Sequence, residues 1–519
     1  MSTRHFYSSR RKRDEINRNQ QTQNDLKLVV FPDTGYFYNI GIYLTGMTEK
    51  TQSFSFDKEI GDNTQTIIEQ ELQKQQTDEV VPFSNEENTD EAEYDPDGKK
   101  YDSHRTSWLM TTILVIAETA SSGPLSNPSA VAVVGFVPGT ILFVALGVIA
   151  TYTAVLLHEY WKEHQHIRNY DEAGEIIFGR VGKEVLLWCQ IALLIFFNAS
   201  VIEPAADALY VLGNQKTCYV IFSVVVTVFG ILISIPRTLR GVSYLSIIAI
   251  ISWLVAVIPT MVGVATQDAP MPGVKPGTNI HLSIASSASF YDIVGAVNDI
   301  VYAYSGHMVF FNLILEMRHP MEFRKAVIIA FAITTFIYTF YGVFIYAYTG
   351  IYAQSPYFFN LVNPKLQKAT FFLQIPNLLI AGVNYAYLAT KNVLRRFPSK
   401  RTAAYKNDLK SWALWLFLVA TFWWVPWLLE ELIPVFDDLI GIGGALFASQ
   451  FTYGLPCLFW CYQHRSKLFR WPFILLTIIN VIIFLLSWLS LGVGVYANID
   501  NIKMLSDSGA IPKPFSCSQ

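Results

Sequence analysis

Eleven apolar segments, each long enough to cross a bilayer as a helix, follow one another between residues 106 and 497. A hydrocarbon core requires about 20 mostly apolar residues per helix. Lone charges occur inside several segments, but no charged cluster divides any of them. We number them spans 1 to 11, at residues 106–134, 137–158, 184–212, 217–235, 242–265, 286–316, 326–350, 370–390, 411–433, 438–462 and 472–497. The pattern predicts an all-α integral membrane protein with eleven transmembrane helices.

The composition excludes several other classes of protein. Charged residues make up 15% of the chain, against about 25% in a typical soluble domain, so most of it is not an ordinary water-facing globule. Five cysteines in 519 residues do not form a disulfide framework, and we leave open whether Cys218 and Cys517 pair. The sequence has no phosphate-binding loop, zinc-protease motif or hydrolase elbow. We therefore expect no enzyme activity, no cofactor, no metal site and no nucleic-acid partner.

The distribution of charge predicts the orientation of the spans. Residues 1–105 are polar and mostly acidic, which predicts a disordered N-terminal tail. With that tail in the cytosol, the inner loops carry 19 Lys and Arg and the outer side carries 6. Positive charge concentrates on cytosolic loops, so the tail is predicted inside and the C-terminal tail, residues 498–519, outside. We favour the plasma membrane over the vacuolar membrane.

Two spans are interrupted at mid-depth by residues that do not favour a helix. Span 1 contains Ala120–Pro128, with a glycine and two prolines, and span 6 contains the small and polar stretch Tyr302–His307. These interruptions free backbone amides and carbonyls inside the membrane. Matched breaks predict a five-plus-five inverted repeat, residues 106–265 and 286–462, followed by an eleventh helix at 472–497. The alternative is that both stretches merely kink packed helices.

Four stretches also resemble a known family. They are Ile116–Ser129, Phe290–Lys325, Phe447–Pro456 and Tyr170–Gly179, which are similar to parts of the amino acid/auxin permeases, and most of all to the fungal neutral amino acid permease branch. The resemblance covers residues 105 to about 497. Pro124 and Asn127 stand where the family usually has an aliphatic residue and a leucine. The resemblance implies a secondary transporter of the amino acid–polyamine–organocation fold that imports amino acids, commonly with protons.

The two breaks are the predicted binding site for an amino acid. Amides at a half-helix start favour a carboxylate, and loose carbonyls accept an ammonium group. The predicted substrate-binding residues are Glu118, Ser121, Ser122, Gly123, Pro124, Leu125, Tyr304, Ser305 and Gly306. Span 8 contains four further candidates, which either line the pathway or pack against neighbouring helices: Asn384, Tyr385, Tyr387 and Thr390.

Ionisable residues at membrane depth are candidates for coupling or gating, because a charge in hydrocarbon is costly. We single out Glu118, His307 and Asp299. Glu118 can accept the coupling proton, or can be tied to a Ser or Tyr of another helix. For His307 we favour packing over titration, and for Glu203 and Asp207 we favour solvation at the outer end of span 3.

The sequence therefore predicts a transporter that carries neutral amino acids by alternating access. We expect symport with protons, and sodium is the other possible coupling ion. Its expected partners are the amino acid, the coupling ion and the lipid bilayer, with protein partners left open. The alternative function is an amino acid sensor that signals through the tail at residues 1–105.

Overall fold

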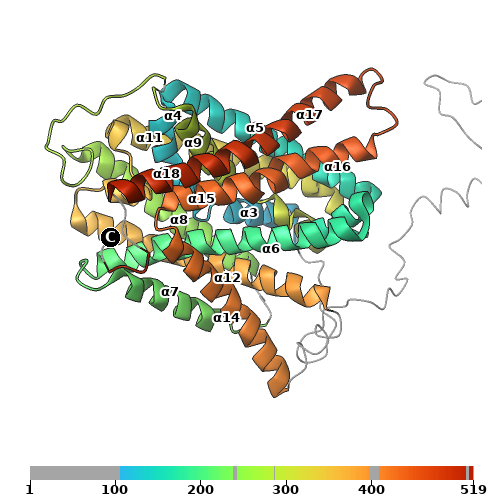
Figure 1. Cartoon of the computed structure of the whole chain (residues 1–519), viewed down its shortest axis with the longest axis horizontal. Coiled ribbons are helices and arrows are strands. Elements are labelled where there is room, and N and C mark those ends of the chain that lie inside the picture. Colours follow the sequence, from blue (N-terminus) through green and yellow to red (C-terminus); the bar gives the residue numbers. More distant parts are fainter. Residues whose placement is uncertain (1–105, 238–241, 286, 398–407, 510–513, 518–519) are drawn as a thin grey trace, which may run out of the picture. The chain divides into compact units, whose positions relative to one another are not determined.

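The computed structural model describes residues 106–237, 242–285, 287–397, 408–509 and 514–517. The predicted tail at residues 1–105 lies outside them. Every named element in the described part of the chain is a helix, which confirms the all-α prediction (Figure 1). A single isolated bridge, between Thr106 and Met317, is the one extended pairing among these residues.

The first half of the chain forms the helices expected for spans 1 to 5. Span 1 is divided into three pieces, and span 3 is the membrane part of a longer helix. The elements are α3 (Trp108–Thr119), η1 (Gly123–Ser126), α4 (Asn127–Val134), α5 (Phe136–Glu163), α6 (Tyr170–Leu212), α7 (Tyr219–Ile233) and α8 (Val242–Thr266).

The second half corresponds to spans 6 to 11, and three of these spans change helix type along their length. Span 6 is broken, and spans 10 and 11 contain π-helical turns. The elements are α9 (Phe290–Ala303), η2 (His307–Val309), α10 (Phe310–Glu316), η3 (Pro320–Glu322), α11 (Phe323–Thr349), η4 (Gly350–Tyr352), η5 (Tyr357–Asn360), α12 (Pro364–Arg396), α14 (Leu409–Leu432), α15 (Phe436–Gly443), η6 (Gly444–Ala448), η7 (Gln450–Gly454), α16 (Leu455–Gln463), α17 (Phe473–Leu489), η8 (Ser490–Gly494) and α18 (Val495–Ser508).

Seven helices in the described chain are long and apolar enough to cross a bilayer. Two shorter apolar helices, α3 and α7, belong to predicted spans 1 and 4. A multi-pass membrane protein is therefore confirmed, while the number eleven stays a prediction because several spans are interrupted or short.

Helix α6 runs across the bundle and packs against α7, α12, α14 and α15 (Figure 1). Close packing there depends on a glycine: a Cβ on Gly382 of α12 would lie 2.7 Å from the Trp423 ring and 2.8 Å from Asn198 Oδ1. Small residues allow membrane helices to approach closely, and packing and hydrogen bonds then hold them together. The large apolar side chains of α17 point outward instead, as expected of a helix facing lipid.

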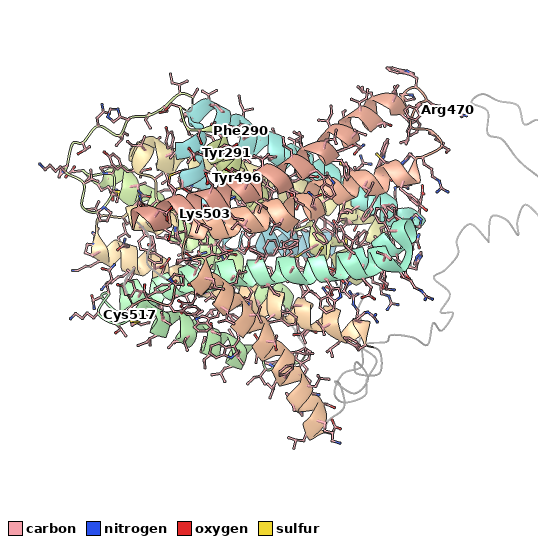
Figure 2. The ribbon with its side chains drawn as sticks, in the orientation of Figure 1. Phe290, Tyr291, Arg470, Tyr496, Lys503 and Cys517 are labelled. Carbon is pink, nitrogen blue, oxygen red and sulfur yellow. A yellow bond between two sulfur atoms is a disulfide. The ribbon has the colours of Figure 1, made fainter. Side chains whose placement is uncertain are left out.

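The two ends of the bundle differ in chemistry. Figure 2 places Arg470, between α16 and α17, at one end and Lys503 and Cys517 at the other. We call the first the basic end, since α3 begins there, α5 and α12 finish there, and Lys162, Arg395 and Arg396 lie in the last turns of α5 and α12. We call the second the disulfide end.

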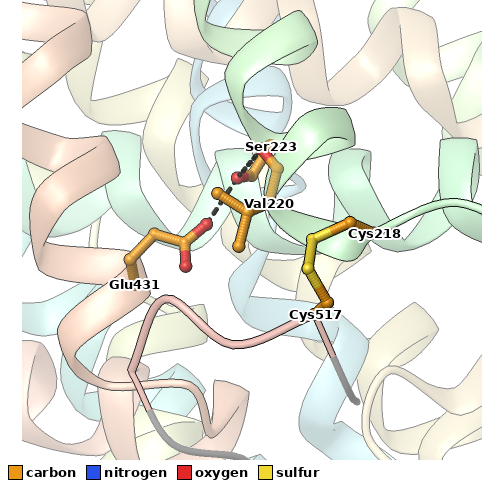
Figure 3. The surroundings of a disulfide bond; sticks show 5 residues. All are labelled: Cys218, Val220, Ser223, Glu431 and Cys517. Carbon is orange, nitrogen blue, oxygen red and sulfur yellow. Dashed lines mark hydrogen bonds between the residues drawn. A yellow bond between two sulfur atoms is a disulfide. The ribbon is translucent and has the colours of Figure 1, made fainter.

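A disulfide joins Cys218 and Cys517, which answers the question that the sequence left open (Figure 3). Cys218 precedes the first residue of α7, and Cys517 lies in the C-terminal segment. The same segment packs on α14, where the Phe515 and Trp427 ring centroids are 6.0 Å apart. Beneath it, Ser223 Oγ donates to Glu431 Oε1 at 2.6 Å. The disulfide therefore fastens the C-terminal segment to the start of α7, and the ring contact places the same segment on α14.

This bond predicts the behaviour of a cleaved protein. A protease site placed at Gly273–Gly277, where added side chains would meet open space, lies between the two cysteines in the chain. After cleavage, we expect the two fragments to migrate together on a non-reducing gel and to separate once reductant is added. In a Cys517→Ser variant they should separate without reductant. Separation of the parent fragments without reductant would show that the two cysteines are not bonded.

Candidate functional site

The break in span 1 leaves a row of backbone amides unused. Helix α3 closes with the Ala120 amide donating to Ile116 O at 2.8 Å, and η1 begins with the Leu125 amide donating to Ser122 O at 2.9 Å. Within the described chain, the amides of Ser121, Ser122 and Gly123 donate to no backbone acceptor. Proline at position 124 has no amide to offer. Three donors therefore gather where η1 and α4 start, at the positive end of their dipoles.

The break in span 6 leaves carbonyls unused instead. After α9, the amide of Ser305 donates to Tyr302 O at 3.1 Å, and its hydroxyl donates to the same oxygen at 2.6 Å. The carbonyls of Ala303, Tyr304 and Ser305 accept no hydrogen bond from the residues that the structure describes. The break therefore offers acceptors, and both interruptions predicted from the sequence are present.

The two breaks touch each other. A Cβ on Gly123 would lie 2.8 Å from Ala303 Cα, closer than real Cβ atoms approach other atoms, and 3.1 Å from Tyr302 Cδ1. Only glycine therefore permits this approach, and the donors of one break lie beside the acceptors of the other. Ser122, Gly123 and Tyr304 are all buried in this conformation.

Side chains from continuous helices hold the first break in its unwound form. Ser122 Oγ lies 2.7 Å from Ser200 Oγ of α6, and Tyr385 of α12 donates to Ser121 Oγ at 2.9 Å. Asn377 of α12 donates to Ala120 O at 2.8 Å. In lipid an unpaired backbone group costs several kcal/mol, so these contacts stabilise the break.

Pro124 and Asn127 share one partner. Tyr341 of α11 donates to Pro124 O at 2.5 Å and accepts from Asn127 Nδ2 at 2.6 Å. The two residues are thus joined through a single hydroxyl. Asn127 is fully buried, and this bond pairs its amide nitrogen, while its Oδ1 has no hydrogen-bond partner among the described residues.

Sequence reasoning missed Ser200, Tyr341 and Asn377 as residues that hold the first break. Each is a polar residue inside an apolar span, and Asn377 follows Pro376 directly. That pattern signals a polar contact without naming the partner. Of the span 8 candidates, the structure brings Tyr385 to the break.

Glu118 lies at the junction of the two breaks. A Cβ on Gly306 would lie 3.5 Å from Glu118 Cγ and 3.2 Å from Thr119 Cγ2. Glu118 is half-buried, and its enclosed oxygen Oε1 has no hydrogen-bond partner among the described residues. At that oxygen, Glu118 is therefore not hydrogen-bonded to a neighbouring Ser or Tyr, which was the alternative role.

His307 and Asp299 are placed differently from Glu118. His307 Nε2 lies 2.9 Å from Ala150 O and 3.1 Å from Thr153 Oγ1, so its ring is held against α5. Its other ring nitrogen, Nδ1, has no hydrogen-bond partner among the described residues, so packing, favoured over titration, stays a prediction. Asp299 is buried about one turn before the break, within electrostatic range of Asp437 and Asp438.

Two acidic residues were misplaced by sequence reasoning. Glu203 and Asp207 were expected to be solvated, but they are 5% and 4% exposed. The expectation is wrong because α6 is buried on every side from Phe197 to Ala208. Hydropathy indicates how deep a residue lies along a helix, but it does not indicate how fully other helices surround it.

Aromatic rings form the walls beside the breaks. The Phe197 centroid lies 4.8 Å from that of Tyr302 and 5.2 Å from that of Tyr385, and the Tyr304 and Tyr338 centroids are 5.4 Å apart. Among the described residues, no group of His, Cys, Asp and Glu could hold a metal ion. The arrangement therefore combines donors for an anion, acceptors for a cation and an apolar wall.

The contact at Gly123 generates a stability prediction. We expect Gly123→Ala to lower the free energy of unfolding by about 1–3 kcal/mol, since the added methyl forces α9 away. Gly492→Ala is the matched control, because a Cβ there meets nothing within 4 Å. Thermal unfolding of the purified variants measures both. Equal midpoints for the two variants would contradict the close contact.

Comparison with known proteins connects this geometry to a family. A family model described as "Transmembrane amino acid transporter protein" matches residues 104–499. The chain is 29% identical over 418 residues to the "N amino acid transport system protein" of Neurospora crassa, covering 80% of this chain and 89% of the relative.

Two further relatives agree. Identity is 25% over 415 residues with a "Transmembrane transporter" of Gibberella moniliformis, covering 79% of this chain and 87% of the relative. It is 24% over 382 residues with "Amino acid transporter AVT1J" of Arabidopsis thaliana, covering 72% and 85%. These are transporters rather than enzymes. The chain belongs to the transmembrane amino acid transporter family, the amino acid/auxin permeases.

Proposed function

We propose that this protein is a secondary active transporter that carries neutral amino acids across a membrane by alternating access, in symport with protons. The observation that carries the proposal is the contact between the two breaks, which sets free amides beside free carbonyls. The carboxylate and the ammonium of an amino acid are attached to the same Cα, so its binding site needs hydrogen-bond donors and acceptors side by side. Membership of an amino acid transporter family supports this choice of substrate.

The carboxylate would bind to the amides at the start of η1. Of the predicted stretch Ser121–Leu125, Pro124 has no amide and the amide of Leu125 is already bonded to Ser122 O. The donors for the carboxylate are thus narrowed to Ser121, Ser122 and Gly123. The ammonium would lie against the carbonyls of Ala303–Ser305.

A neutral side chain fits the surroundings of the breaks. Residues 107–134 and 290–316 contain no Lys or Arg that could pair with an acidic substrate side chain. Tyr302, Tyr385 and Phe197 supply an aromatic wall against which an apolar group can pack. Access would alternate as spans 1, 2, 6 and 7 rock against the other spans.

Glu118 is our candidate for the coupling proton. It is the one ionisable side chain in residues 107–134, and it lies against Gly306 of the second break. A carboxylate with an unpaired buried oxygen gains from being protonated, and protonation there can be linked to the arrival of the substrate ammonium. Proton binding and substrate binding would then depend on each other.

Two observations support an extracytosolic disulfide end and a cytosolic basic end. Disulfides form and persist in oxidising compartments, and Cys218–Cys517 marks one end of the bundle. Lys and Arg concentrate at the opposite end, as they do on cytosolic loops. We propose the plasma membrane as the location, with the N-terminus in the cytosol.

Glu118→Gln tests the coupling. In proteoliposomes with an imposed pH gradient, we expect this variant to lose concentrative uptake and its pH dependence while still exchanging substrate across the membrane. Glu431→Gln is the control, because Glu431 lies at the disulfide end bonded to Ser223. Fully pH-dependent, concentrative uptake by Glu118→Gln would remove Glu118 from the coupling role.

A substrate panel tests the class of amino acid. Radiolabelled alanine, phenylalanine, glutamate and lysine are offered to proteoliposomes under an imposed proton or sodium gradient. We expect uptake of alanine and phenylalanine, driven by protons and at least about tenfold above that of glutamate or lysine, because an unpaired buried charge costs several kcal/mol. Preference for a charged amino acid, or dependence on sodium alone, would contradict the proposal.

A further inference from the structure

Three asparagines from three separate elements meet at the basic end of the bundle. Asn312 of α10 donates to Asn169 Oδ1 at 2.7 Å, and Asn169, just before α6, donates to Asn392 Oδ1 of α12 at 3.0 Å. We call Asn169, Asn312 and Asn392 the asparagine latch. Arg395 of α12 adds a hydrogen bond to Asn392 Oδ1 at 3.0 Å.

The central asparagine bonds to Asn312 in either orientation of its amide. With the amide turned over, Asn169 nitrogen donates to Asn312 Oδ1 at 3.2 Å, and its oxygen accepts from the Arg395 guanidinium of α12 in place of the bond to Asn392. Asn169 and Asn392 are 1% and 4% exposed, and Asn312 is half-buried, so water competes little for the bond between the first two. Buried amide bonds of this kind hold elements in one arrangement.

An ion pair beside the latch contributes less. Arg395 NH2 lies 3.6 Å from Asp171 Oδ1. Burial raises the pKa of the Asp171 carboxyl, and the charge of Arg395 opposes that rise. The pair is long and its carboxylate is costly to desolvate, so the fastening of α10 depends on the amides.

The latch connects two kinds of helix. Helices α3 and α10 are half-helices that end or begin near the breaks, whereas α6 and α12 continue past them. The basic ends of α3 and α10 are also joined to each other. Thr106 donates to Glu316 O at 3.2 Å, and Arg318 donates to Thr106 O at 3.0 Å.

This connectivity makes α3 and α10 one unit that can pivot at the breaks. Asn312 lies six residues beyond Gly306, about 9 Å along a helix, and Asn392 lies seven residues beyond Tyr385, about 10 Å. The latch is therefore located between the breaks and the basic end, where the pivoting unit meets α6 and α12.

We propose that the asparagine latch is the contact that closes the pathway between the breaks and the basic end, and that it opens in each cycle to release the amino acid there. The inference rests on the proposed transport function and assigns Asn312 and Asn169 as positioning residues of the gate. They act on the substrate pathway through the position of α10.

A reporter cysteine tests the latch without any substrate. Ala389 of α12 is 1% exposed and lies between Tyr385 and Asn392 along the helix. Ala389→Cys is made in the full chain after Cys189, Cys457 and Cys461 are replaced by Ser, which leaves the disulfide intact. The rate of modification by a charged methanethiosulfonate reagent then measures how often the basic end opens.

We expect Asn312→Ala to speed this modification by about tenfold, the equivalent of one lost hydrogen bond. Asn312→Asp should return the rate toward that of the parent, because its carboxylate accepts from the Asn169 nitrogen once the Asn169 amide is turned over. The control is Glu184→Gln, which weakens the 2.6 Å pair between Arg396 and Glu184 on the two continuous helices. That variant should leave the rate unchanged.

An Asn312→Ala rate within twofold of the parent, or an equal acceleration by Glu184→Gln, overturns the proposal. If Asn312→Ala does not yield folded protein, Asn169→Ala carries the same expectation, and an unchanged rate there overturns it equally. Labelling needs no substrate. If the labelling rates overturn the latch proposal while amino acid uptake is intact, the transport proposal therefore still stands. If Asn312→Ala accelerates labelling but the parent protein transports no amino acid, the transport proposal is rejected and the latch proposal stands.

Discussion

The need to pair every backbone polar group inside a membrane governs this structure. Two helices stop being helical at mid-depth, and each interruption leaves amides or carbonyls that lipid cannot satisfy. The protein tolerates them because side chains from α6, α11 and α12 reach the first break, and because the two breaks abut at Gly123 and Ala303. The groups still unpaired are those that an amino acid zwitterion can pair.

The same constraint explains how Pro124 and Asn127 are accommodated. Proline at position 124 has no amide, and its carbonyl accepts from the Asn127 amide and from the Tyr341 hydroxyl. Tyr341 also accepts from the Asn127 side chain, so one hydroxyl serves both residues. The start of α4 is therefore held to α11, a helix that we propose moves together with it.

Local features of the chain were predictable, and long-range partners were not. Proline, glycine and small residues mark the two breaks directly, because their effect on a helix is local. The partner of Pro124 is 217 residues away and that of Ala120 is 257 residues away, and a single sequence contains no signal that joins them. The Cys218–Cys517 bond has the same character. Glu203 and Asp207 were wrongly expected in water, since hydropathy does not indicate that other helices surround this part of α6 on every side.

The account is tested most directly by a structure determined with a transported neutral amino acid bound. We expect its carboxylate within hydrogen-bonding distance of the Ser122 and Gly123 amides and its ammonium against the Ala303–Ser305 carbonyls. An amino acid bound at any other place in the bundle, with these groups still empty, would contradict the central claim.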